Sequence, residues 1–409
     1  MKSKLFLIVF CAGCAAAGFG QSLLGLTFPY GVPVQENSGM SLTMGGAGCA
    51  VADDYNVMLK NPANLGAVDR TVLSALFSVD MLRISDAGSH TNFLSGVPTQ
   101  VSIGIPFGAA GTVGLSYELR SDCSALFRDG TSVPYNGSFA AESLGLAAQG
   151  GLVAWQVGWG YSILKAVQIG ISYERFYLSE EQTRLSTLII SGAQTNSRDS
   201  MKVEGRYNGI RAGVMVPVGK VKLAVSGEYN FTGETRSFTG VYSNGSTVPS
   251  ANSYATQTFN LRLPPSLSLG VSYDISPEWL VASDVGLCFW QQSEFSGVLA
   301  RPGAATATGI SLGAQYIPAP NLLTPKYWET IRYRAGIRFT QLPGKESYEY
   351  MLSLGTGLPL GKGFGLLDIG LEIGRRQSGL FKDYSEDIVR IGIGFNGGHK
   401  WANPAKGTY

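Results

Sequence analysis

Between Thr71 and Asn396 the sequence consists of short segments in which apolar residues alternate with polar or small ones. Alternation of this kind is typical of β-strands with one apolar face. About fourteen segments fit the pattern, an even number, as bacterial outer-membrane barrels have. Connections after odd-numbered segments are mostly long and polar, and those after even-numbered segments are mostly short. This sorting predicts an all-β fold, a transmembrane antiparallel β-barrel with long loops at one end.

We assign the predicted strands to these ranges: Thr71–Val79, Gln100–Phe107, Thr112–Leu119, Gly151–Ile163, Gln168–Tyr177, Met201–Val216, Val221–Phe231, Phe259–Asp274, Trp279–Trp290, Gly309–Ile317, Ile331–Phe339, Tyr348–Leu358, Phe364–Gly374 and Asp387–Asn396. Four polar segments are predicted to be long loops: Asp80–Thr99, Arg120–Gly145, Leu178–Ser200 and Thr232–Thr258. Pro264 and Pro265 interrupt one strand, and because proline cannot donate to the ladder we expect a bulge there.

A membrane barrel also accounts for the composition. Charged residues make up 15% of the chain, whereas about a quarter is usual. Glycine supplies 54 of the 409 residues, roughly twice its average share. In lipid every backbone N–H and C=O must pair within the protein, so spanning strands must close on themselves. The net charge of +2 gives no reason to expect nucleic acid as a partner.

The first twenty residues predict export. Two lysines precede an apolar stretch, Leu5–Cys14, and the small residues Gly18–Gly20 form a cleavage site, an order typical of signal peptides. The alternative is a lipoprotein signal with Cys11–Cys14 as its attachment box, although leucine is expected at the first position of that box. The remaining cysteines have neither metal-site nor disulfide spacing, and we expect them to be unpaired: Cys49, Cys123 and Cys288.

The segment Ser38–Leu65 precedes the first predicted strand and is the most distinctive part of the chain. Three of its glycines disfavour both helix and strand, because glycine loses the most backbone freedom on ordering: Gly45, Gly46 and Gly48. The pair Asp53-Asp54 offers an N-cap for a short helix, Tyr55–Lys60. Asn61-Pro62 ends that helix. We expect one aspartate to cap the helix and the other to pair with a barrel arginine; a metal or acid–base pair is the weaker alternative.

Three motifs in this segment resemble the N-terminal hatch of the FadL/toluene-transporter family of outer-membrane hydrophobic-compound transporters: Gly46-Ala47-Gly48, Ala52-Asp53-Asp54 and Asn61-Pro62-Ala63. Two further motifs resemble later parts of the family's barrels: Leu263-Pro264-Pro265-Ser266 and Pro325-Lys326-Tyr327-Trp328. The resemblance implies a barrel of about fourteen strands with a small hatch inside the lumen. We therefore expect a signal peptide at 1–20, a hatch at 21–70, a barrel at 71–397 and a periplasmic tail at 398–409.

The resemblance also implies a function. It implies passive uptake of hydrophobic small molecules, such as long-chain fatty acids or aromatic hydrocarbons, by an integral, non-enzymatic protein of a Gram-negative-type outer membrane. Membrane lipid and a hydrophobic ligand are the expected partners, no cofactor or metal is expected, and the protein is expected to be monomeric. The hatch glycines would supply the mobility that passage requires. Two alternatives stay open: a FadL-like component of a secretion or surface-protein-assembly system, and a porin-like channel whose lumen lacks a hatch.

The inward faces of the C-terminal strands carry a predicted ladder of charges. Arginines alternate with apolar residues in Ile331–Phe339, and carboxylates do so in Phe364–Gly374. The predicted lumen residues are Arg332, Arg334, Arg338, Asp368, Glu372 and Arg390. Two strand spacings are about 10 Å, which an arginine can cross over the small residues of the strand between. The ladder would hold wall and hatch together, or one arginine would bind a ligand carboxylate.

No catalytic residues are expected. Gly392–Gly397 matches a dinucleotide-binding fingerprint in its letters, but no helix follows to receive a phosphate. No Gly-x-Ser-x-Gly motif occurs, and the two histidines, His90 and His399, lie in a predicted loop and in the predicted tail. A hydrolase built on serine and histidine is therefore poorly supported.

Overall fold

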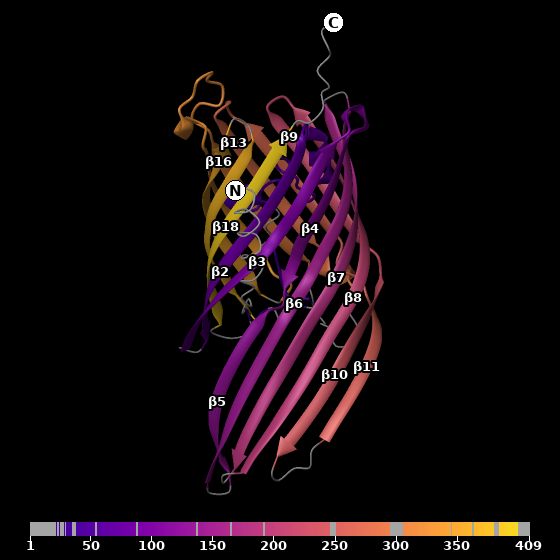
Figure 1. Ribbon diagram of the computed structural model, residues 1–409, viewed down its shortest axis with the longest axis vertical. Helices are drawn as coiled ribbons and strands as arrows, with labels where there is room; N and C mark the ends of the chain where they lie inside the picture. Colours follow the sequence, from indigo (N-terminus) through magenta and orange to yellow (C-terminus); the bar gives the residue numbers. More distant parts are fainter. Residues whose placement is uncertain are drawn as a thin grey trace, which may run out of the picture.

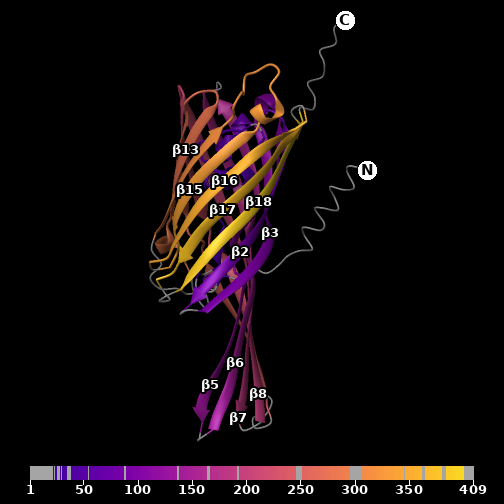
Figure 2. The same cartoon turned by 90° about the vertical axis from the view of Figure 1, so that its left-hand side faces the viewer.

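The structure is a computed structural model. It describes residues 38–53, 55–86, 89–135, 138–163, 166–190, 193–245, 251–294, 306–344, 346–361, 364–379 and 384–399, together with 22, 24, 28 and 30–34. These residues form a closed antiparallel β-barrel from which a narrower sheet projects at one end (Figures 1 and 2). The predicted signal peptide and nearly all of the predicted tail lie outside the described residues.

Fourteen strands form the described barrel wall, as predicted. They are β2 (Thr71–Asp86), β3 (Ser89–Pro106), β4 (Thr112–Asp122), β6 (Ser138–Ile163), β7 (Val167–Ile190), β8 (Ala193–Val218), β9 (Val221–Asn230), β12 (Ser266–Asp274), β13 (Trp279–Cys288), β14 (Ala307–Tyr316), β15 (Arg332–Gln341), β16 (Tyr348–Leu360), β17 (Gly365–Gln377) and β18 (Ser385–His399). Each pairs with its neighbours in antiparallel register, and β18 pairs with β2 to close the wall. Because β18 reaches His399, the last strand is longer than predicted.

Alternation along each wall strand separates two environments. In β16, Leu352 and Leu354 are 51% and 53% exposed, whereas Ser353 between them is fully buried. The exposed apolar side chains form the outer face of the barrel, as a lipid-facing wall requires. The intervening small and polar side chains face inward. Within the described residues, no helix combines the length and the apolar character that a membrane crossing needs.

The projecting sheet is built from β5 (Ala125–Tyr135), β10 (Gly233–Gly245), β11 (Ala251–Leu261) and the outer parts of β6, β7 and β8. Its strand order is β5-β6-β7-β8-β10-β11. Figure 2 shows these strands leaving the barrel as a narrow sheet.

All four predicted long loops were wrong, because most of their residues lie in strands. The loops after the third, fifth and seventh predicted strands contain the strands of the projecting sheet, and Asp80–Thr99 is mostly the hairpin of β2 and β3. Outside lipid a strand needs no continuous apolar face, so its backbone can pair while its sequence reads as polar.

Prolines and glycines mark the boundary between barrel and projection. Pro264 and Pro265 separate β11 from β12, so the predicted bulge within one strand is wrong and two strands replace it. The prolines have no N–H to continue the ladder. On β6, Gly150 has a φ of 111°, and a Cβ there would lie 2.0 Å from the carbonyl oxygen of Ser179. Only glycine permits this approach.

The described N-terminal segment (residues 22–70) packs on the inner face of the wall. It contains β1 (Val32–Pro33), α2 (Gly39–Thr43) and the 3₁₀ helix η2 (Pro62–Ala67). Shorter 3₁₀ turns lie elsewhere, at η3 (Gly108–Ala110), η4 (Trp290–Gln292) and η6 (Tyr327–Glu329). The predicted helix Tyr55–Lys60 is wrong, since this stretch is irregular. Ser38 caps α2 and Asn61 caps η2 instead, because each offers a side-chain oxygen to an unpaired backbone N–H.

Candidate functional site

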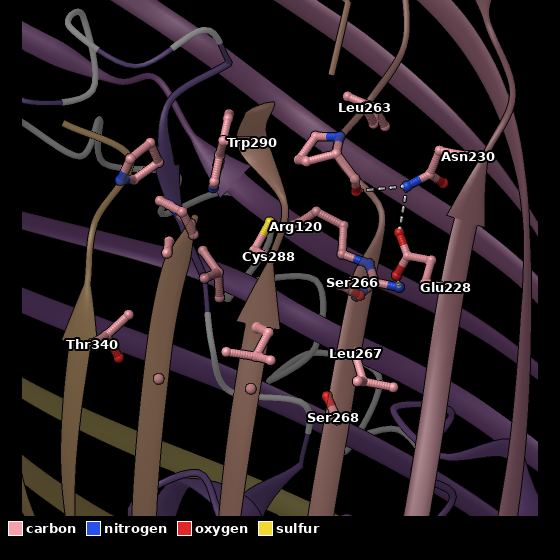
Figure 3. Close-up of a pocket in the computed structure, with 18 of the residues that line it drawn as sticks. Arg120, Glu228, Asn230, Leu263, Ser266, Leu267, Ser268, Cys288, Trp290 and Thr340 are labelled. Atoms are coloured by element: carbon pink, nitrogen blue, oxygen red, sulfur yellow. Dashed lines mark hydrogen bonds and ion pairs between the residues drawn. The ribbon is translucent and has the colours of Figure 1, made fainter. Parts of the chain in front are cut away.

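A cavity of about 210 Å³ lies where the barrel wall, the N-terminal segment and the base of the projecting sheet meet (Figure 3). Its apolar side is lined by buried side chains of one hydrophobic cluster: Tyr30, Leu152, Phe176, Leu263 and Trp290. The rings of Tyr30 and Trp290 stack with their centroids 5.2 Å apart. Because Tyr30 precedes β1 and Trp290 follows β13, residues distant in sequence form this wall.

The opposite side of the cavity carries charges that compensate one another. Arg120 Nη2 lies 3.1 Å from Glu174 Oε2, and Arg211 Nε lies 2.8 Å from Glu174 Oε1. Both arginines also pair with Glu228, and Arg120 lies 3.5 Å from Glu118. Asn230 donates to Glu228 and to the carbonyl of Pro264, as the dashed lines of Figure 3 mark. Two guanidinium groups thus face three carboxyl groups, and Lys60, which also lines the cavity, pairs with Asp284. Among the described lining residues, each cation is therefore paired with a carboxylate.

The predicted hatch residues sit in tight contact with the wall. Gly45 and Gly46 have φ values of 65° and 88°, and a Cβ on Gly45 would lie 2.7 Å from the Ile337 backbone. Gly48 has no such φ but donates its N–H to Asp284 Oδ2 at 3.0 Å. Gly45 and Gly46 therefore have a conformational reason to be glycine, whereas the Gly48 hydrogen bond requires only a backbone N–H. Their predicted role in hatch movement stays a prediction.

The Asn61-Pro62-Ala63 motif is held by hydrogen bonds and by wall glycines. Asn61 accepts from the N–H of Ala63 at 3.1 Å and donates to the carbonyl of Cys49 at 2.9 Å. Pro62 lies so close to β7 that a Cβ on Gly170 would meet its carbonyl at 2.3 Å. The motif thus ties the two halves of the N-terminal segment together and rests on the wall.

Asp53 makes a local turn and a contact with the wall. Its Oδ1 accepts from the N–H of Tyr55 at 2.8 Å, and its Oδ2 lies 2.6 Å from Arg332 Nη1. Burial alone would raise the pKa of Asp53, but the Arg332 guanidinium and the Tyr55 N–H lower it below 3.8. Asp53 therefore makes the predicted pair with a barrel arginine, whereas the predicted capping role is wrong because no helix follows. Asp54 lies outside the described residues.

The predicted ladder residues form buried ion pairs. Arg334 Nη1 lies 2.5 Å from Asp368 Oδ1, and both side chains are almost completely buried. The pair crosses β16 over Gly357, where a Cβ would lie 2.9 Å from Asp368 Oδ1. Glu372 joins Arg338 at 3.6 Å and Arg390 at 3.2 Å.

Several charged residues of the lumen were missed from the sequence. Arg376 pairs with Glu349 at 2.6 Å and with Glu386 at 2.7 Å, and Arg390 pairs with Asp80 at 2.7 Å. The period of two could have found both residues, because Arg376 lies four residues from Glu372 on β17 and Glu349 lies four residues from the buried Ser353 on β16.

Asp284 of β13 was also missed, and it connects the wall to the N-terminal segment. Its Oδ2 accepts from the N–H groups of Gly48 and Cys49, each at 3.0 Å, and lies 3.1 Å from Lys60 Nζ. The period of two along β13 puts this aspartate on the inner face, but its contacts depend on the segment packed opposite. We call these four residues the Asp284 clasp.

Among the described residues, no cluster of three or more histidine, cysteine or acidic side chains is arranged to hold a metal ion. Cys49, Cys123 and Cys288 are free thiols. Burial raises the pKa of the Cys49 thiol to about 12, so this cysteine is unreactive. Gly392–Gly397 lies inside β18, a context with no phosphate-binding helix.

Solved structures share this fold. The Pseudomonas putida toluene transporter TodX matches with a TM-score of 0.61 and 16% identity, covering 90% of this chain and 99% of that one. A Pseudomonas aeruginosa FadL homologue matches with a TM-score of 0.62 and 12% identity, covering 91% and 100%. The CymD monoaromatic hydrocarbon channel matches at 0.59 and 15%, covering 91% and 98%. Identities this low show the fold alone, and for the fold they confirm the resemblance drawn from the sequence.

The comparison with curated proteins found no match. A protein-family model described as BamG matches residues 2–406, which is almost the whole chain. The chain therefore belongs to the BamG family and has the barrel fold of the FadL/toluene transporters.

Proposed function

We propose that the protein passively takes up small, uncharged hydrophobic molecules across the outer membrane of a Gram-negative bacterium. The observation that carries this proposal is the cavity between the N-terminal segment and the barrel wall, beside the Tyr30–Trp290 stack. Its apolar lining suits a nonpolar molecule. Similar barrels named for toluene and for monoaromatic hydrocarbons support the choice of ligand class.

Size and charge narrow the ligand class. A dry cavity of about 150 Å³ holds benzene, and this cavity measures about 210 Å³. A single aromatic ring suits that volume better than a long-chain fatty acid. The carboxylate of a fatty acid would also lack a partner, because the cations of the described lining, Lys60, Arg120 and Arg211, already pair with carboxylates of the protein. We therefore favour aromatic hydrocarbons over fatty acids.

Passage requires the N-terminal segment to act as a hatch. The Asp284 clasp and the Asp53–Arg332 pair hold that segment to the wall. A ligand that leaves the cavity toward the short-turn end has to wait until such contacts open. No energy source is implied, so uptake follows the concentration gradient, and a monomer suffices for it.

The test is retention of toluene by the purified protein in mild detergent, measured by mass spectrometry after gel filtration. We expect about one equivalent in the native protein and none in Ala307→Phe, which fills the cavity. Leu322→Phe, at an exposed site away from the cavity, is the matched control and should retain toluene. Equal retention in native protein and Ala307→Phe, or none in the native protein, contradicts the proposal.

A second candidate function is assembly of cell-surface proteins. The projecting sheet favours it, because six strands extend beyond the barrel at the end opposite the short turns (Figures 1 and 2). In an outer membrane that end faces the exterior. A ligand channel does not need such a structure.

Shortening the β10–β11 hairpin tests this second function. Residues 237–257 would be replaced by an Asn-Gly turn, which suits a two-residue hairpin. If the sheet serves assembly, cells carrying the variant lose protease-accessible surface proteins while the purified variant still retains toluene. An unchanged surface proteome rules this function out.

A further inference from the structure

We propose that the outer edge of β11 docks an extended segment of a second protein, which adds a strand to the projecting sheet. The inference deepens the second candidate function, on which it rests, and it does not depend on ligand uptake. It is carried by the backbone and side chains of Tyr254–Phe259.

The outer edge of β11 offers backbone groups to a partner. β11 pairs with β10 from Ala251 to Leu261 without a register shift. Over Tyr254–Phe259 no described strand pairs with its other side, since β12 pairs with β9 and β13; just beyond β11, Arg262 forms a bridge with Glu294. Figure 1 places β11 at the margin of the projection. An unpaired edge presents a row of N–H and C=O groups that an extended polypeptide can complete.

The sequence of β11 also lacks the charges and prolines by which many proteins block strand addition. Its sequence, ANSYATQTFNL, holds no charged residue and no proline. The opposite edge strand, β5, holds Arg128, Asp129 and Pro134. Charges and proline discourage edge pairing. The two edges of one sheet are therefore built differently, and only β11 is suited to a partner strand.

A groove on one face of the projecting sheet reaches β11 at Tyr254 and offers contacts for side chains. It measures about 530 Å³ and is lined by β7, β8, β10 and β11. Tyr254 is 83% exposed, and its ring covers Gly240 at 3.2 Å from the ideal Cβ position. Leu185 and Tyr242 continue the apolar lining, and Arg198 is its one charged residue. We expect a partner segment with an apolar side chain beside Tyr254 and an acidic one toward Arg198.

Membrane orientation disfavours a second copy of this chain as the occupant. Copies inserted in one membrane have the same orientation, so their β11 strands run in the same direction. Two such strands could form only a parallel ladder, which is slightly less stable per residue than an antiparallel one. A segment of another protein can run either way.

Site-specific photo-crosslinking in cells tests the proposal. A benzoylphenylalanine would replace Ala255, Gln257 or Phe259 in turn. The control position is Gln149 on β6, because β6 lies inside the sheet with β5 and β7 as its neighbours. We expect adducts with one other protein from the β11 positions only. When the probe is moved two residues along β11, the crosslinked position in the partner's sequence should shift by two residues, because paired strands keep register.

A charged edge should block the adduct. Thr256→Lys should lower the yield from the Ala255 probe at least tenfold, whereas Gln149→Lys adds the same charge away from the edge and should not. The fraction of heat-modifiable barrel on gels controls for folding. Adducts to residues 295–305 of the same chain, adducts to a second copy, adducts without a two-residue step, or no adduct above the Gln149 level overturn the proposal.

These results separate this inference from the function on which it rests. If shortening the β10–β11 hairpin removes surface proteins but no edge adducts form, the assembly function is supported and docking at the β11 edge is refuted. If adducts form along β11 in two-residue steps but shortening the hairpin leaves the surface proteome unchanged, docking is established and the assembly function is ruled out.

Discussion

The barrel wall and the projecting sheet share strands β6, β7 and β8, yet the two regions use different chemistry. Within the wall, the Glu174 side chain of β7 is completely buried on the inner face, whereas Ile171 is 51% exposed on the outer, lipid-facing side. In the projection, the same strand carries polar residues on both faces, such as Arg184 and Thr187. The comparison teaches that lipid imposes the alternation and that backbone pairing persists without it.

The difference predicts that buried lumen charges matter far more than charges elsewhere. Arg334→Ala leaves the buried Asp368 with its Asn396 hydrogen bond but without the guanidinium with which it pairs, so we expect a loss of about 3–5 kcal/mol of unfolding free energy. Urea unfolding in lipid vesicles, followed by gel mobility, measures it. Arg375→Ala removes an exposed pair with Asp387 and should cost at most about 1 kcal/mol. Similar losses in the two variants would contradict this view of the lumen.

Wall glycines should matter next, because the N-terminal segment packs directly on them. A Cβ on Gly336 would lie 2.3 Å from the backbone carbon of Met44. Gly336→Ala should therefore cost about 2–3 kcal/mol by overpacking and expose the segment to protease. Gly286→Ala is the control, since nothing lies within 4 Å of its Cβ position. Unchanged protease resistance in Gly336→Ala would show that the N-terminal segment does not need this close contact with the wall.

The Asp53–Arg332 pair should make the packing of the N-terminal segment against the barrel wall depend on pH. The folded-state pKa of Asp53 is lowered from 3.8, so its stabilisation is present above pH 3.8 and is lost as pH falls through the folded pKa. Asp53→Asn should cost about 1.5 kcal/mol at neutral pH. Its difference from the native protein in protease resistance should shrink below pH 3.8. A difference that stays constant with pH would contradict the pairing.

The smallest effect is expected in the projection. Tyr254→Ser removes an exposed ring and should change the unfolding free energy of the barrel by no more than about 0.5 kcal/mol. The same urea series checks it. A large loss would mean that the projection stabilises the wall, and the contrast between the regions would fail.

The barrel was largely predictable from the sequence. The period of two in segments such as Ile331–Phe339 reports which side chains meet lipid, and it also placed Arg334 and Asp368 on the inner face. The projecting sheet was not predictable in this way, because β10 and β11 have no lipid-facing side and so no alternation that marks a strand. Local patterns also gave the wrong helix at Tyr55–Lys60, since Asp53 uses its carboxylate for a turn and for Arg332.

The residues of the candidate site likewise fall into those that the sequence predicted and those that it missed. Sequence reasoning singled out Asn61 and Gly48 but missed Asp284, which receives the Gly48 N–H from a strand 236 residues away. It likewise missed Arg120 and Arg211, whose shared partners lie on different strands. Contacts of this kind depend on which distant segments meet, and no window of sequence contains both partners.

The sequence by itself determined that the chain closes into a membrane barrel, because lipid forces a local rule on every spanning strand: one apolar face and complete backbone pairing. Only the tertiary structure decided where the N-terminal segment rests, which charges compensate one another and which strands continue beyond the wall. Those outcomes depend on close approach between remote residues, such as Pro62 on Gly170. Local sequence does not encode such distances.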